Sequence, residues 1–125
     1  MLKKYTFVIA LFYTCLLTIV SLISVTGLPD LDYSNSDKIF HFIAYSGLTL
    51  FWFLTFSNNL KWTFNKALLF SAIISVIFGI IIEILQGVLT ETRVADNNDI
   101  LANTLGVSLT IVILLLFKKA LVKKL

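Results

Sequence analysis

The chain has 125 residues, of which 58% are hydrophobic and only 14% are charged. Soluble globular domains average about 45–50% apolar and about 25% charged residues, so this composition excludes a water-soluble domain and requires a surface that faces lipid. Cys15 is the single cysteine, which excludes an intramolecular disulfide and a cysteine-based metal site.

Four apolar stretches follow one another along the chain, over residues 5–26, 39–57, 67–89 and 100–117. Each is close to the ~20 residues that a helix needs to cross the hydrocarbon core of a bilayer. Helices are expected because lipid offers the backbone no hydrogen-bond partner. The sequence therefore predicts an all-α polytopic membrane protein, a four-transmembrane-helix bundle that forms a single domain over residues 1–125.

The charged residues divide between the two ends of these predicted helices. One side has eight of the ten basic residues and no acidic residue, a charge of +8; the other has two basic and seven acidic residues, a charge of −5, which together give the net +3. The eight basic residues are Lys3, Lys4, Lys61, Lys66, Lys118, Lys119, Lys123 and Lys124. Lysine-rich short loops stay in the cytoplasm, so we expect a multi-pass protein of the cell membrane with both termini inside. The positive charge thus indicates topology and contact with the lipid bilayer, and we expect no nucleic-acid partner.

The second apolar stretch begins with a row of polar side chains. Asp37, His41 and Tyr45 are spaced i, i+4, i+8, so they share one side of the helix as it enters the membrane from outside. With a rise of 1.5 Å per residue, His41 lies ~6 Å deeper than Asp37.

The third and fourth stretches have polar residues at a similar depth. Glu83 lies ~9 Å below the outer end of the third helix, with Gln86 about one turn above it. Asp96, Asp99 and Asn103 share a face of the fourth helix, which places Asn103 ~6 Å below Asp99. Ionisable groups are costly in lipid and usually face inward toward partners, so we expect one shared polar pocket that opens to the outside.

Two glycines in the same stretches, Gly79 and Gly106, have a different expected role. A residue without a side chain lets two helix backbones approach closely in a membrane. We therefore expect tight helix contacts at both positions.

The polar residues also form two sequence elements with fixed spacing. Residues 37–45 read D-K-x-x-H-F-x-x-Y, residues 83–86 read E-x-x-Q, and residues 93–106 read R-x-x-D-x-x-D-x-x-x-N-x-x-G. This pattern resembles the VanZ-like family of small integral membrane proteins. The family is named for a member associated with teicoplanin resistance, so the resemblance implies a function at the cell envelope, on a lipid or cell-wall precursor outside the membrane, and a link to antibiotic resistance.

An enzyme is one function that these groups could serve. His41 and Glu83 are the candidate catalytic acid and base, and Arg93 with Lys38 would hold a phosphate or carboxylate by charge-assisted hydrogen bonds. An outer-leaflet lipid or lipid-linked envelope precursor fits this location. The candidate substrate-binding residues are Asp37, Lys38, Tyr45, Gln86, Arg93, Asp96, Asp99 and Asn103.

Other interpretations stay open at this point. The protein could be a non-catalytic module that binds a head group or a partner protein, or a small transporter that works as an oligomer. Asp37 and Asp96 could simply cap helices, and Glu83 could be a structural partner of Arg93 or His41. One histidine with scattered carboxylates is a weak metal signal, so the sequence predicts no metal and no cofactor. Enzymatic activity, ligand and oligomeric state are left open.

Overall fold

The computed structural model describes residues 2–22, 33–89 and 97–124, and the side chains of residues 4–22, 38–88 and 99–123. Every regular element in these ranges is a helix, which confirms the predicted all-α fold. In chain order the elements are η1 (Leu2–Tyr5), α1 (Thr6–Leu22), α2 (Tyr33–Leu54), η2 (Thr55–Asn59), α3 (Phe64–Leu89), α4 (Asn97–Leu116) and α5 (Lys118–Lys124).

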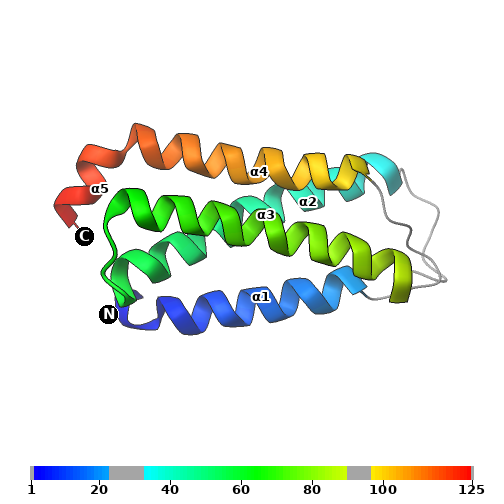
Figure 1. Ribbon diagram of the computed structural model, residues 1–125, viewed down its shortest axis with the longest axis horizontal. Helices are drawn as coiled ribbons and strands as arrows, with labels where there is room; N and C mark the ends of the chain where they lie inside the picture. The colour runs from blue at the N-terminus through cyan, green and yellow to red at the C-terminus, as the bar shows by residue number, and fades with distance from the viewer. Residues whose placement is uncertain (1, 23–32, 90–96, 125) are drawn as a thin grey trace.

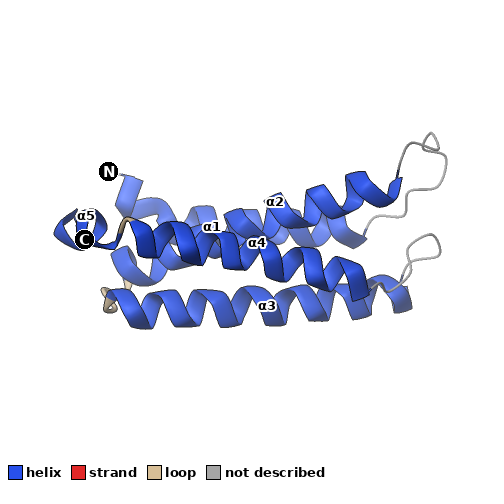
Figure 2. Cartoon of the chain, turned by 90° about the horizontal axis from the view of Figure 1, so that it is seen from above, coloured by secondary structure: helices blue, strands red, loops and turns tan. Residues whose placement is uncertain are grey.

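The four long helices run alternately up and down along one axis (Figures 1 and 2). Both chain ends and the short connection between η2 and α3 lie at one end of the bundle, which we call the terminal end. The last turns of α1 and α3 and the first turns of α2 and α4 lie at the opposite, distal end. This order follows from short connections, which make consecutive helices antiparallel.

Three helical segments are long and apolar enough to cross a membrane, namely Lys38–Asn59, Phe64–Val88 and Asp99–Leu116. The fourth apolar helix, α1, has 17 residues and is ~26 Å long at 1.5 Å per residue. The helices α2, α3 and α4 begin three to six residues before the predicted apolar stretches. The first turns of these helices contain polar residues that an apolar pattern leaves out. The helix starts predicted from hydrophobicity alone are therefore too late in the chain.

Large apolar side chains cover the outside of the bundle, for example Phe12, Ile43, Ile77 and Leu116, each more than half exposed. Large exposed apolar patches mark surfaces that contact lipid or another protein, and this one belongs to helices apolar enough to cross a membrane. Inside, the terminal half is packed with aromatic and aliphatic residues, namely Phe53, Phe56, Phe64, Ala67, Leu68 and Leu114. The distal half instead buries polar and ionisable side chains.

Helices α2 and α4 approach each other closely at Gly106. A Cβ atom at this position would lie 2.3 Å from the carbonyl oxygen of Phe42, so a side chain cannot be added without moving a backbone. Ser46 Oγ lies 2.8 Å from Phe42 O and 3.0 Å from Gly106 O, and Thr110 Oγ1 donates to Ser46 O at 2.8 Å. These contacts confirm the expected close approach at Gly106, and they fix the position of α4 against α2.

Candidate functional site

Four polar side chains from three helices meet in the distal half of the bundle. They are His41 on α2, Glu83 on α3, and Asp99 and Asn103 on α4, and each is at most 3% exposed. We call this set the distal polar cluster. Because these side chains are buried, their charges and dipoles must be balanced by partners within the protein.

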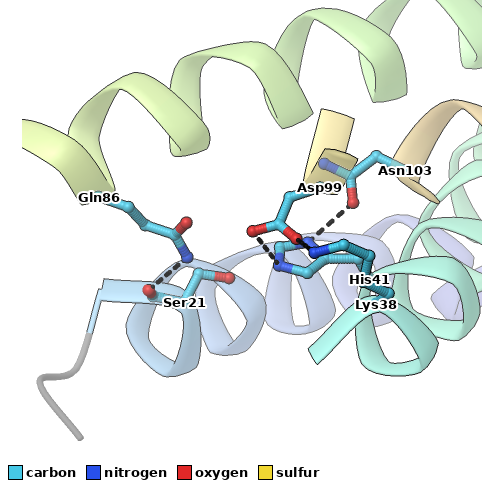
Figure 3. A network of polar contacts seen from close by, with 6 residues as sticks. All are labelled: Ser21, Lys38, His41, Gln86, Asp99 and Asn103. Carbon is cyan, nitrogen blue, oxygen red and sulfur yellow. Dashed lines mark hydrogen bonds and ion pairs between the residues drawn. The ribbon is translucent and has the colours of Figure 1, made fainter. Parts of the chain in front are cut away.

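The His41 ring is held from both sides by α4 (Figure 3). Its Nδ1 lies 2.8 Å from Asn103 Oδ1, and its Nε2 lies 3.6 Å from Asp99 Oδ2. An amide oxygen can only accept, so Nδ1 has the proton and donates it to Asn103. This hydrogen bond turns Nε2 toward the carboxylate of Asp99.

Lys38 lies one turn nearer the distal end of α2 than His41. Its Nζ donates to Asp99 Oδ1 at 2.9 Å, and its side chain is 28% exposed whereas that of Asp99 is 5% exposed. The Asp99 carboxylate thus lies between Lys38 and His41, with one oxygen toward each (Figure 3). Its place in the first turn of α4 also puts it at the positive end of the helix dipole. Asp99 therefore belongs to the cluster and is more than a helix cap.

Glu83 approaches the same point from α3. One ligand atom from each of His41, Glu83 and Asp99 lies within 4.8 Å of the other two. The structure therefore brings together polar groups from the three helices that the sequence analysis named. Two carboxylates and an imidazole at this spacing can exchange a proton or share a cation.

Tyr45 and Gly79 pack against the cluster. The Tyr45 ring is fully buried and stacks on that of His41, with ring centroids 6.1 Å apart and planes at 22°. A Cβ at Gly79 would lie 2.9 Å from Asn103 Nδ2 and 3.1 Å from Tyr45 Cε2. Gly79 therefore leaves the space that both side chains occupy, which agrees with the expected close packing. Among the described residues, Tyr45 Oη and Asn103 Nδ2 have no hydrogen-bond partner.

Gln86, a candidate substrate-binding residue, contacts α1. Its Nε2 donates to the carbonyl oxygen of Ser21 at 2.8 Å, and Figure 3 shows this pair apart from the His41 contacts. Ser21 is in the last turn of α1, where carbonyl groups lack helical partners. Gln86 thus joins α3 to α1. Sequence inspection could not identify this partner, because a backbone carbonyl leaves no signal in the residue type.

Three expected site residues are not placed by these contacts. Arg93 and Asp96 lie outside the described residues, and Asp37 belongs to α2 but its side chain is outside the described part. Their expected functions stay predictions.

An apolar groove adjoins the cluster between α2 and α4. Its volume is about 430 Å³, and it is lined by Lys38, Ile39, Phe42, Leu101, Ala102 and Leu105. Lys38 is the only charged residue of this lining, and the same ammonium group binds Asp99. The groove could not be predicted from the sequence, because its apolar residues do not differ in type from those of the other exposed helix faces.

Comparison with known proteins supports the motif-based expectation. A search of curated proteins and a search of solved structures each gave no match. The family model described as VanZ/LLP1 matches residues 3–118, a span that includes the whole distal polar cluster and the groove. The chain therefore belongs to the VanZ/LLP1 family.

Proposed function

We propose that the protein binds an anionic lipid of the outer leaflet, with its phosphate at Lys38 and its hydrocarbon chain in the groove between α2 and α4. The observation that supports this best is the position of Lys38. It joins an otherwise apolar groove to a buried group of ionisable side chains. A ligand with a charged head and an apolar chain matches both halves of this arrangement.

Lys38 can serve a second anion while it holds Asp99. An ammonium group has three donors, so one such group can contact more than one anion at a time. The partial exposure of Lys38 leaves the group within reach of the head-group region. In the enzyme form of this proposal, a hydrolase of lipid-linked envelope precursors, water would attack the phosphorus as the ester P–O bond breaks. His41 and Glu83 would then be the base that takes the proton of the water and the acid that protonates the leaving oxygen.

The orientation is part of the proposal. Four spans with both termini in the cytoplasm would place the distal end, and with it Lys38, at the outer leaflet. The lysines of η1, the η2–α3 connection and α5 support this, because they gather at the terminal end and positive residues favour the cytoplasmic side. An outer-leaflet site also agrees with the envelope function that the family name implies.

Cysteine labelling tests this orientation. In a Cys15→Ser background, Thr92→Cys, between α3 and α4, should react in intact cells with a thiol reagent that does not cross membranes. Lys119→Cys, on α5 at the terminal end, should react only after the cells are permeabilised. Labelling of Lys119→Cys in intact cells would reverse the orientation and with it the outer-leaflet proposal.

Lipid binding can be measured with the protein in phosphatidylcholine nanodiscs that contain a polyisoprenyl phosphate, a phosphatidylglycerol or an uncharged polyisoprenol. Loss of one charge-assisted hydrogen bond is worth about 1.5–3 kcal/mol. We therefore expect Lys38→Gln to weaken binding of the isoprenyl phosphate by about tenfold to 100-fold. Lys66→Gln at the terminal end, which removes a cation that lies over the Trp62 ring, should leave binding unchanged.

The groove has its own test in the same assay. Leu105→Trp should narrow the groove and weaken binding, whereas Leu116→Trp, at another exposed position of α4, should not. Tighter binding of phosphatidylglycerol than of isoprenyl phosphate would identify an ordinary phospholipid as the ligand. Equal binding of isoprenyl phosphate and isoprenol, or full binding by Lys38→Gln, would contradict the proposal.

A further inference from the structure

We propose that His41, Glu83 and Asp99 form a binding site for one divalent metal ion of the zinc or manganese class. Nothing in the sequence spacing required these residues to meet, since they come from three different helices. Their ligand atoms nevertheless lie within 4.8 Å of one another, and all three residues are buried.

The first argument is the geometry between His41 and Asp99. A charge-assisted N–H···O bond is about 2.7–2.9 Å long, but Nε2 and Oδ2 are 3.6 Å apart. Two ligands at ~2.1 Å from a tetrahedral zinc ion are ~3.4 Å apart. The observed separation is thus close to the edge of a metal tetrahedron and long for a direct bond.

The second argument is the orientation of the imidazole. Because Nδ1 donates its proton to Asn103 Oδ1, the neutral form of His41 presents a lone pair on Nε2 toward a carboxylate oxygen. Two lone pairs that face each other need a cation between them, either a proton or a metal. Proteins usually orient a metal-binding histidine by a hydrogen bond to an oxygen from the ring nitrogen that does not bind the metal.

The third argument is the orientation of the two carboxylates. Asp99 accepts from Lys38 through Oδ1 and turns Oδ2 toward His41, so one oxygen is fixed and the other is directed at the site. Glu83 approaches from α3 with the longer side chain, and a movement of at most ~1.4 Å would bring a separation of 4.8 Å to the ~3.4 Å of a tetrahedral site. One nitrogen and two carboxylate oxygens suit zinc or manganese, and the remaining coordination positions would be left for water or a phosphate oxygen.

This site does not depend on lipid binding. Its test uses tag-free protein in detergent without added phospholipid, stripped with a chelator, reloaded with Zn²⁺ or Mn²⁺ and desalted. Elemental analysis of the wild type should find one ion per chain. The metal should also raise the Tm by several degrees, because an ion that binds only the folded state stabilises it.

The variants Glu83→Gln and Asp99→Asn keep the size of each side chain and should lose the stoichiometric ion and the metal-dependent rise in Tm. Asn103→Leu should bind about tenfold to 100-fold more weakly, because it removes the acceptor that orients His41. Asn103→Asp keeps that acceptor and should bind more tightly than Asn103→Leu. Thr49→Ala, which removes a buried hydroxyl that bonds only within α2, should retain the ion.

The Tm of each variant without metal shows whether it is folded. A wild-type protein that retains neither metal would overturn the proposal and leave a protonated His41 paired with Asp99. Retention of a full equivalent by both Glu83→Gln and Asp99→Asn would overturn it as well. The lipid measurement on Lys38→Gln is independent of either result.

Discussion

Replacement of Glu83 by glutamine should abolish the function of this protein while the protein still accumulates in the membrane. Glutamine has the size of glutamate but cannot take up a proton or supply a carboxylate ligand, so the packing of α3 is kept and the chemistry of the cluster is lost. His41→Ala should have the same effect. The phenotype to measure first is glycopeptide susceptibility, because of the family to which the chain belongs, with folded membrane protein quantified in parallel.

The double mutant distinguishes a site from a set of separate contacts. Residues that act as a unit lose most of their function with the first replacement, so Glu83→Gln with His41→Ala should be no worse than either single change. Independent residues would give effects that roughly add. Ser75→Ala is the matched control: Ser75 is fully buried on α3, two turns below Glu83, and its replacement should leave the phenotype intact.

Two results would contradict this account of the cluster. A normal phenotype in Glu83→Gln would mean that the buried carboxylate has no function in activity. A loss of phenotype matched by an equal loss of folded protein would mean that the cluster serves to hold the helices together.

Gly106→Ala should destabilise the folded protein by about 2 kcal/mol. Overpacking a well-packed contact typically costs about 1–3 kcal/mol, and here the added atom meets the backbone carbonyl of Phe42 at 2.3 Å, which cannot rotate away. The gain in helix propensity from glycine to alanine, about 1 kcal/mol, only partly offsets this. Unfolding in mixed micelles of mild detergent and sodium dodecyl sulfate, followed by circular dichroism, would measure the difference.

Gly47→Ala is the control for this prediction. A Cβ at Gly47 would meet the Tyr13 hydroxyl at 2.7 Å, which is the end of a side chain and not a backbone atom, so it can shift together with its hydrogen bond to Ala44 O. The same substitution in the same kind of helix should therefore change the free energy of unfolding by less than about 1 kcal/mol. Equal destabilisation by both variants would show that the contact with the Phe42 carbonyl has no special importance.

Much of the fold follows from the sequence because lipid imposes simple rules. The apolar runs predict helices, since no other backbone structure in a short chain satisfies its own hydrogen bonds in a bilayer. Helical rise then predicts depth, and His41, Glu83 and Asn103 were correctly placed at a similar level. Helix bounds were less accurate, because the polar first turns of α2 and α4 do not contribute to an apolar pattern although they are helical.

The partners of each polar side chain were decided by the tertiary structure alone. Gln86 is only three residues from Glu83, yet it contacts Ser21 of α1 while Glu83 lies near His41 and Asp99. Three residues leave two side chains about 60° apart on one side of a helix and about one turn apart along it, and here the two side chains meet different neighbours. Periodicity gives the direction of a side chain from its own axis, but not which helix lies there.

By itself, the sequence determined an all-helical fold with helices apolar enough for a membrane, membership of the VanZ/LLP1 family, and the residues able to build a site. Only the tertiary structure decided that Asp99 lies between Lys38 and His41, that Asn103 orients the imidazole, and that an apolar groove ends at Lys38. The physical reason is the close approach of α2 and α4 at Gly106. It brings together side chains about sixty residues apart, at distances that no one-dimensional pattern specifies.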